Sequence, residues 1–254
     1  MTILNEPVAF EKIHACGNDF LLVEKDLPAE VIAKICDRHH GLGADGIMVK
    51  GDIKGAEVEF RHFDPDGSRS FCLNGIRASL MALFQKKLVP QQGTVVSEGV
   101  YLTYIIDSQV AVGLPVRPYR RLIWSSGSDT IPGYFCNVGN PHFVCWDVPE
   151  LEFRQLSPRI RADMESFPEG ANVNWLKMTD NGWLVRTYER GVEDFTLSCG
   201  SGMYACALVL AGELGLNQIV FLPQGQGEVR TWIRDEVLFM SGTTSWVAGG
   251  NWRC

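Results

Sequence analysis

Two stretches of the 254-residue sequence decide the fold. Residues 72–84 read CLNGIRASLMALF, and residues 199–214 read CGSGMYACALVLAGEL. Each begins with a cysteine, and the helix-length runs that follow, 74–84 and 201–214, carry apolar residues on nearly every side. A helix that is apolar all round is enclosed by other structure instead of lying on a surface. We therefore expect two helices, each wrapped by a sheet.

These two stretches belong to a longer internal repeat. Three matching motifs occur in the same order in each half of the chain, at shifts of 122 to 127 residues. The matched pairs are 17–23 with 139–144, 43–50 with 170–177, and 72–78 with 199–205. A repeat at half the chain length predicts a duplication and two similar lobes. We expect the lobes at 1–114 and 119–244, with the proline-bearing stretch 113–118 as the linker.

Short segments rich in β-branched and aromatic residues separate the helices. They lie at 8–14, 20–24, 57–63, 101–106, 143–146, 183–188 and 229–233. Two more helices are expected at 28–38 and 158–164, because a proline in the first turn follows a possible capping residue, Asp26 or Ser157. The fold class that this pattern predicts is α+β, with sheet in the majority.

The composition indicates a globular protein that acts on small molecules. The net charge is −7 and no run of lysine or arginine occurs, which argues against nucleic acid and membrane surfaces as partners. The sequence has no secretory signal and no uninterrupted apolar run of about 18 residues, so we expect a cytoplasmic protein. The eight cysteines lack the spacing of a disulfide scaffold, and none completes a metal-binding motif. We therefore expect reduced thiols and no metal.

The positions of Cys72 and Cys199 carry the chemistry. A helix N-terminus leaves backbone N–H groups unpaired, so it can bind a carboxylate and lower the pKa of a nearby thiol. Asn74 and Ser201 suit the cap position of the two helices. One thiolate can remove the α-proton of an amino acid while a thiol on the opposite face returns one. This arrangement predicts racemisation or epimerisation of an amino acid without a cofactor.

Three other charged or titratable residues are candidates for the same site. His142 belongs to one of the doubled motifs and could orient or activate a thiol. Glu189 and Arg190 follow a predicted strand and precede the second cysteine. The alternative for this pair is an exposed ion pair.

Asparagines and the remaining cysteines complete the set of polar candidates. Asn18, Asn140 and Asn172 can hydrogen-bond to polar groups of a substrate, or can serve as turn residues. The cysteines in apolar runs or helix interiors are expected to pack in the core: Cys36, Cys136, Cys145 and Cys206.

Eight motifs are spread over almost the whole chain: KIHACGNDF, GLGADGIMV, HFDPDGS, CLNGIR, GNPHFV, GANVNW, YERG and SCGSG. As a set they resemble the motif series of the diaminopimelate epimerase family. The resemblance implies two pseudo-symmetric lobes, each a β-barrel-like antiparallel or mixed sheet around a central helix. It also implies a homodimer and a C-terminal segment, about 245–254, that returns to the first lobe.

By motif position, the resemblance implies four catalytic residues and a set of substrate-binding residues. The catalytic residues would be Cys72, Cys199, His142 and Glu189. The substrate-binding residues would be Asn18, Asp64, Leu73, Asn74, Asn140, Asn172, Arg190, Gly200 and Ser201. The resemblance assigns carboxylate binding to the backbone amides at the two helix starts.

Two of these positions depart from the family pattern. Asp64 stands where the family usually has an asparagine that touches the distal end of diaminopimelate. A carboxylate there would favour a cationic or neutral substrate side chain. Leu73 stands where glycine is usual, and it adds a bulky side chain at the edge of the site.

Three hypotheses of function remain open. The first is epimerisation of LL- to meso-diaminopimelate, a precursor of lysine and peptidoglycan. The second is racemisation of another amino acid, such as histidine or a basic one, by the same two thiols. The third, from a different class, is a thiol-disulfide switch or binding protein. Exchange of a substrate α-proton separates the first two from the third.

Overall fold

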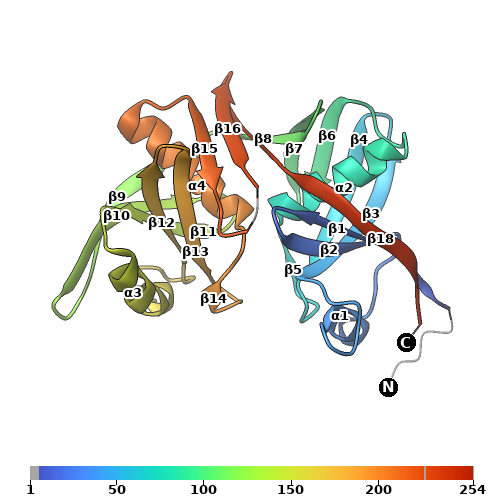
Figure 1. Ribbon diagram of the computed structural model, residues 1–254, viewed down its shortest axis with the longest axis horizontal. Coiled ribbons are helices and arrows are strands. Elements are labelled where there is room, and N and C mark those ends of the chain that lie inside the picture. The colour runs from blue at the N-terminus through green and yellow to red at the C-terminus, as the bar shows by residue number, and fades with distance from the viewer. Residues whose placement is uncertain (1–5, 226, 254) are drawn as a thin grey trace. The chain divides into compact units, whose positions relative to one another are not determined.

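The computed structural model describes residues 6–225 and 227–253 (Figure 1). Its strands and helices form two compact units. The first unit comprises Met1–Leu114 and Ser241–Cys254, and the second comprises Pro115–Met240. Strands outnumber helices in both units, so the expected α+β class with two sheet-dominated lobes is confirmed.

The first unit contains two helices and most of its strands before residue 116. In chain order its elements are β1 (Val8–Ala15), β2 (Asn18–Val23), α1 (Ala29–Cys36), β3 (Gly46–Lys54), β4 (Glu57–Phe63), β5 (Arg69–Ser70), α2 (Leu73–Gln85), β6 (Gln92–Ser97), β7 (Val100–Ile106), β8 (Val110–Pro115) and, near the end of the chain, β18 (Thr244–Trp252). Helix α1 covers a core that includes Val31, Ile35 and Ile47.

The second unit has the same composition of elements. They are β9 (Tyr119–Ser126), β10 (Asp129–Asn137), β11 (Pro141–Trp146), α3 (Glu150–Ala162), β12 (Asn172–Thr179), β13 (Gly182–Glu189), β14 (Asp194–Phe195), α4 (Gly200–Leu214), β15 (Gln218–Leu222), β16 (Val229–Arg234) and β17 (Val237–Gly242). Helix α3 covers a core that includes Phe143, Phe153 and Trp175.

The order and the pairing of strands repeat between the units. Strand β2 pairs parallel with β3 and β4 with β6, and the same pairings recur as β11 with β12 and β13 with β15. The remaining repeated pairs are antiparallel, among them β1 with β18 and β10 with β9. The C-terminal strand β18 therefore completes the first unit as β9 completes the second.

The two central helices are buried over most of their length. Every residue from Leu73 to Leu80 in α2 and from Gly200 to Leu210 in α4 is buried. Burial on all sides explains why neither sequence shows a polar face. Helix α4 ends at Gly215, whose φ of 67° is a left-handed conformation that glycine adopts without steric cost.

Helix α3 corrects one expectation. The predicted helix at 158–164 instead runs over Glu150–Ala162, and Pro158 lies inside it. Its buried face is formed by Phe153, Leu156 and Ile160. Because this apolar stripe packs on the core, the helix tolerates the loss of the backbone hydrogen bond that Pro158 cannot donate. Ser157 does not cap the helix, since its Oγ donates to the carbonyl of Phe153 at 2.6 Å.

All seven predicted strands are present, with ends within two residues of the expected ones. Several strands that were not predicted are buried along most of their length, as β8 and β12 are, so they show no alternation of apolar and polar residues. Others, such as β5 and β14, are only two residues long. Strand β8 also extends into the predicted linker, which leaves only residues 116–118 between β8 and β9.

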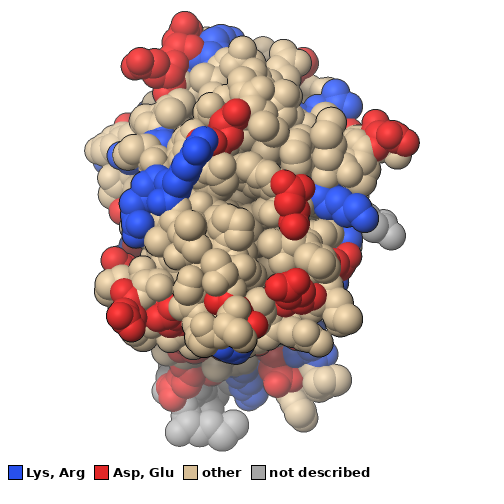
Figure 2. Space-filling view, turned by 90° about the vertical axis from the view of Figure 1, so that its left-hand side faces the viewer, with Lys and Arg blue, Asp and Glu red and all other residues tan. Residues whose placement is uncertain are grey.

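Two further observations concern the surface. Among the described residues, no helix is both long enough and apolar enough to span a bilayer. Figure 2 shows the face at the left of Figure 1, where basic side chains are interspersed with acidic ones.

Candidate active site

Cys72 and Cys199 are themselves the N-caps of the two central helices. Both have extended backbone angles, with φ −132° and ψ 102° at Cys72 and φ −107° and ψ 107° at Cys199. Each sulfur accepts a hydrogen bond of 3.4 Å from the backbone N–H of the glycine three residues on, Gly75 or Gly202. The two units therefore present a thiol in the same geometry.

The expectation that Asn74 and Ser201 cap these helices is wrong. The chain is already helical at Leu73 and Gly200, so both polar residues lie in the first turn. The N–H groups of the first two helical residues have no carbonyl partner within their helix. Each helix start thus combines a sulfur atom with backbone donors suited to a carboxylate.

The glycine that donates to each sulfur is required by close packing. A Cβ on Gly75 would overlap the Sδ of Met48, and one on Gly202 would overlap the Oδ1 of Asn174. The same Cβ on Gly202 would lie 3.2 Å from the sulfur of Cys199. The C-x-x-G spacing in both halves of the sequence is therefore part of the cap.

In the first unit, Asn18 and Asn74 are brought together by a chain of hydrogen bonds. Asn74 Nδ2 donates to Asn18 Oδ1 at 3.1 Å, and Asn18 Nδ2 donates to Asp45 Oδ2 at 2.8 Å. At the other end, Arg77 Nη2 donates to Asn74 Oδ1 at 2.9 Å. The ionised groups at the two ends determine which way each amide faces.

Asp64 lies in the turn between β4 and β5, apart from this hydrogen-bonded chain. Its backbone N–H donates to the carbonyl of Ser68 at 2.9 Å, and its carbonyl accepts from Gly67 at 2.8 Å. Its half-exposed carboxylate is 3.9 Å from Nδ1 of His62. Burial lowers the pKa of His62, although the charge of Asp64 opposes that effect.

In the second unit, Cys199 is buried beside Glu189. Burial raises the pKa of the Cys199 thiol well above its usual range, and the Glu189 carboxylate raises it further. The Ser201 hydroxyl, 3.6 Å from the sulfur, acts in the opposite direction. Glu189 in turn accepts a short hydrogen bond from Thr196 Oγ1. In the environment of the second unit, Cys199 therefore keeps its proton at neutral pH.

His142 is fully buried and neutral. Burial lowers its pKa to about 3, although the hydrogen bond with Asn174 opposes the shift. The Nδ2 of Asn174 lies 3.1 Å from Nδ1 of His142, while the Oδ1 of Asn174 accepts from Thr187 at 3.0 Å. Since the amide nitrogen can only donate, Nδ1 accepts and the proton of the imidazole is on Nε2. His142 is therefore placed to donate a hydrogen bond from Nε2.

Asn172 and Arg190 lie against one another. Asn172 Oδ1 accepts from the backbone N–H of Arg190 at 2.9 Å, and its Nδ2 donates to the carbonyl of Pro141 at 3.2 Å. The guanidinium of Arg190 donates to the carbonyl of Glu169. Asn140 lies in the turn before β11, where its carbonyl accepts from Val138 at 3.2 Å.

The four cysteines that were expected to pack in the core are all buried. Burial raises the pKa of Cys36 to about 12, of Cys136 to about 11 and of Cys145 to about 12, and it also raises the pKa of Cys206. Within the described part of the chain, no group of three or more potential ligands could hold a metal ion.

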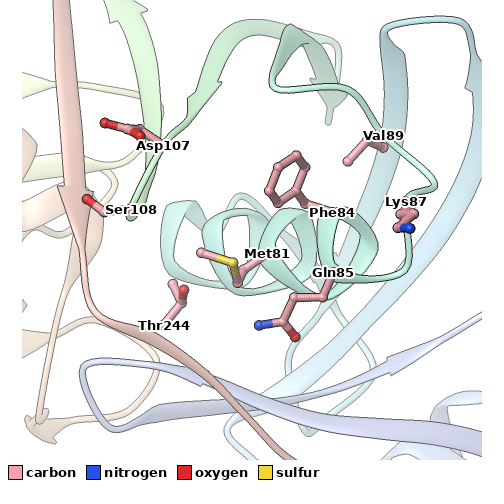
Figure 3. A pocket seen from close by; sticks show the side chains of 8 residues that line it. All are labelled: Met81, Phe84, Gln85, Lys87, Val89, Asp107, Ser108 and Thr244. Atoms are coloured by element: carbon pink, nitrogen blue, oxygen red, sulfur yellow. The ribbon is translucent and has the colours of Figure 1, made fainter.

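A pocket of about 670 Å³ lies in the first unit, at the end of α2 remote from Cys72 (Figure 3). Its lining residues are Met81, Phe84, Gln85, Lys87, Val89, Asp107, Ser108 and Thr244. None of the predicted site residues is among them. This pocket is therefore separate from the candidate active site.

Three residues of the site were missed in the sequence. Asn174 and Arg77 are fully buried and bond to His142 and Asn74, and Thr196 bonds to Glu189. The sequence could have pointed to Arg77, because it is the one charged residue in the apolar run 74–84. The sequence pointed less clearly to Asn174, which is the second asparagine of the GANVNW motif.

Solved structures define the class to which this architecture belongs. A probable proline racemase from Agrobacterium radiobacter superposes with a TM-score of 0.71 at 12% identity, covering 96% of this chain and 92% of its own. A phenazine biosynthesis protein of the PhzF family from Bacillus anthracis superposes with a TM-score of 0.73 at 13% identity, covering 98% and 99%. The protein thus has the two-lobed fold shared by these racemases and phenazine biosynthesis proteins.

Sequence relatives narrow the class to a family. The family model described as Diaminopimelate epimerase matches residues 134–247. The diaminopimelate epimerase of Methanothrix thermoacetophila is 33% identical over 95% of this chain and 94% of its own, and that of Hydrogenobaculum sp. is 30% identical over 94% and 96%. The chain belongs to the diaminopimelate epimerase family and is an isomerase.

Proposed function

We propose that this protein interconverts LL- and meso-diaminopimelate by transferring protons at one α-carbon, with Cys72 and Cys199 as the two acid/base groups. The thiolate of one cysteine takes the α-proton, and the thiol of the other gives a proton to the opposite face of the carbanion-like intermediate. One C–H bond breaks and one forms, so no electrons are gained or lost and no cofactor is needed.

The observation that carries this proposal is the equal geometry of the two thiols. Each caps a buried helix and accepts from the N–H of the third helical residue. The backbone donors beside each sulfur, at Leu73 and Asn74 and at Gly200 and Ser201, suit the α-carboxylate. The fixed dipoles of these amides would also stabilise the negative charge that develops on the substrate in the transition state, because they need no reorganisation.

His142 and Glu189 have auxiliary roles in this proposal. Glu189 lies beside Cys199 and can relay its proton, while Thr196 orients the carboxylate. His142 is neutral and offers Nε2–H as a donor, so it acts on the substrate or a thiol as a hydrogen-bond donor instead of as a cation. Asn18, Asn140, Asn172 and Arg190 remain the proposed substrate-binding residues.

The half-exposed carboxylate of Asp64 favours a second candidate. At the distal end of a substrate it would attract an ammonium or guanidinium group and repel a carboxylate. Diaminopimelate carries an ammonium group and a carboxylate at its distal end. A basic amino acid carries only a cationic group there, and histidine carries a neutral or cationic ring. A racemase of those amino acids is therefore the alternative.

The test is α-proton exchange in deuterated water, followed by NMR, on LL- and meso-diaminopimelate, lysine, arginine and histidine. We expect exchange and inversion with diaminopimelate, and a loss of at least about 100-fold in Cys72→Ser and in Cys199→Ser. Cys36→Ala, at a buried thiol on α1, should keep most of the activity. Exchange with basic amino acids alone would support the second candidate, and exchange with none would refute both and leave the thiol-disulfide switch.

We further propose a homodimer in the cytoplasm, where free thiols persist. Strand β18 carries no charged side chain over residues 244–252, and Trp246 and Val247 on it are about half exposed. A strand without charges is prone to pair with another chain. Light scattering should give twice the mass of one chain, and Val247→Lys should shift the protein toward the monomer; a monomeric wild type would refute the dimer.

A further inference from the structure

Asp45 belongs to a motif that the proposed function does not use. The motif GLGADGIMV, residues 41–49, covers the loop before β3 and the first part of that strand. Strand β3 pairs parallel with β2, and Gly46 lies opposite Phe20. Because the two strands are parallel, the residues at their starts meet at one edge of the sheet. Asp45 therefore lies beside Asn18 and Asp19.

The carboxylate of Asp45 is bound at both oxygens. Its Oδ2 accepts from Asn18 Nδ2 at 2.8 Å and from the backbone N–H of Asp19 at 3.2 Å. Its Oδ1 accepts from Arg38 Nη2 at 2.6 Å. Arg38 is anchored in turn, because the same Nη2 donates to Asp19 Oδ1 at 2.8 Å. These bonds hold the carboxylate in one position, with Oδ2 facing the Asn18 amide.

The ion pair between Asp45 and Arg38 lies at the surface. The two side chains are 41% and 55% exposed. Exposed ion pairs contribute little to the stability of a folded protein. What this pair does determine is the position of the acceptor that the amide nitrogen of Asn18 contacts.

Asn18 has one orientation that satisfies both of its neighbours. Its Oδ1 accepts from Asn74 Nδ2 at 3.1 Å while its Nδ2 donates to Asp45. A flipped amide would place Oδ1 against the carboxylate and Nδ2 against the Nδ2 of Asn74. Both contacts are unfavourable, so the charge on Asp45 excludes the flip. A neutral amide at position 45 can donate as well as accept, and it would allow both orientations.

We infer that Asp45 is a positioning residue, whose charge fixes the amide of Asn18 in the orientation in which this side chain meets the substrate. The inference rests on the proposed function, in which Asn18 binds the substrate. The amide nitrogen carries two hydrogens, and the bond to Asp45 uses one of them. A side chain that is held before the substrate arrives loses less conformational freedom on binding.

The second unit has no carboxylate at the matching position. The residue 127 positions after Asp45 is Asn172, which is uncharged. Its Oδ1 accepts from the backbone N–H of Arg190 and its Nδ2 donates to the carbonyl of Pro141. The charge is therefore specific to the first unit, and Asp45→Asn makes the two positions alike.

The test is Asp45→Asn, which removes the charge and keeps the size of the side chain. With diaminopimelate as substrate, KM should rise about tenfold and kcat should stay nearly unchanged, because a bond to a charged group is the stronger one and the amide binds ground state and transition state alike. A fall in kcat with KM unchanged would overturn the inference. Asp52→Asn removes the same charge from an exposed ion pair on β3 and should change neither constant.

A second measurement observes the amide without turnover. NMR of protein labelled with 15N at asparagine gives the exchange rates with water of the two side-chain hydrogens of Asn18, and Asn18→Ser identifies their signals. The hydrogen bound to Asp45 should exchange more slowly than the other in the wild type and in Asp52→Asn, and the two rates should become alike in Asp45→Asn. If Asp45→Asn does not fold, Arg38→Met should reduce the difference, because it releases Oδ1 of Asp45. Equal rates in the wild type, or an unchanged difference in a folded variant, would overturn the inference.

Failure of the inference and failure of the proposed function give different results. A protected Asn18 hydrogen that depends on Asp45, in a protein that exchanges no substrate α-proton, would refute the proposed function and support the control of the amide by Asp45. Exchange of the α-proton of diaminopimelate with the same KM in the wild type and in Asp45→Asn would refute the inference alone.

Discussion

At the scale of single residues, Asn174 determines which ring nitrogen of His142 carries the proton. Its amide is fully buried and uses both ends, with Oδ1 on Thr187 and Nδ2 on the His142 ring and the carbonyl of Phe143. An uncharged amide can donate to a ring nitrogen from its NH2 group and accept from a hydroxyl at its oxygen at the same time. Burial keeps the His142 ring neutral, and this contact places its proton on Nε2.

Asn174→Asp should change that form. The carboxylate would place an acceptor against Nδ1, so the ring must carry a proton there and its pKa must rise. NMR titration of the His142 ring should show protonation at a higher pH than in the wild type, where the pKa is about 3. Asn137→Asp, in the exposed turn where Asn137 Oδ1 accepts from Gly139, is the matched control and should leave the ring unchanged.

His142 also predicts how stability depends on pH. Its folded pKa of about 3 lies below the usual value of 6.5, so between these values the unfolded chain binds a proton that the folded chain does not. Stability from this group is therefore complete above pH 6.5 and is lost as the pH falls toward 3. Urea unfolding of His142→Gln should show a pH slope smaller by up to about 1.4 kcal/mol per pH unit in this window. Equal slopes would contradict the neutral ring.

At the scale of elements, the cysteine caps make the central helices the functional elements of the chain. Each helix starts at a residue whose sulfur is both cap and proposed acid/base group. The repeated C-x-x-G spacing places a glycine N–H against that sulfur in both units. Packing around the two glycines differs, because Gly75 faces a flexible methionine and Gly202 faces the fixed amide of Asn174.

This difference predicts unequal effects of one substitution at matched positions. Gly202→Ala should destabilise the protein by about 1–3 kcal/mol, as overpacking against a hydrogen-bonded amide does. Gly75→Ala should cost less, because Met48 can change rotamer and alanine favours a helix by up to about 1 kcal/mol. Chemical denaturation of both variants measures the two costs. A larger loss for Gly75→Ala would show that the Met48 side chain is held more firmly than Asn174.

At the scale of the whole molecule, the chain is a duplication in which each unit is completed by an added strand. Strand β9 is the first strand of the second unit, whereas β18 is the last strand of the chain and pairs with β1 over Val8 to Ala15. Strand β18 also packs against α2, the helix that Cys72 caps. The last strand of the chain therefore supports the first of the two thiols.

Truncation after residue 243 should unfold the first unit selectively. It removes β18 and leaves β1 paired on one side only, with β2. Limited proteolysis should cut the region around α2 and spare 115–240. Truncation after Trp252 retains β18 and serves as the control. Uniform proteolysis of both units would show that the units do not fold separately.

The sequence by itself determined the duplication, the two all-apolar helices, the thiols at their starts and seven of the strands, because these features are periodic or local along the chain. Only the tertiary structure decided that the cysteines, not Asn74 and Ser201, are the caps, that α3 runs through Pro158, and that Arg77 and Asn174 are buried against site residues. Caps and buried polar contacts depend on atoms brought together from distant positions. Burial and charge at those contacts, which no local pattern records, give the two matched thiols different surroundings.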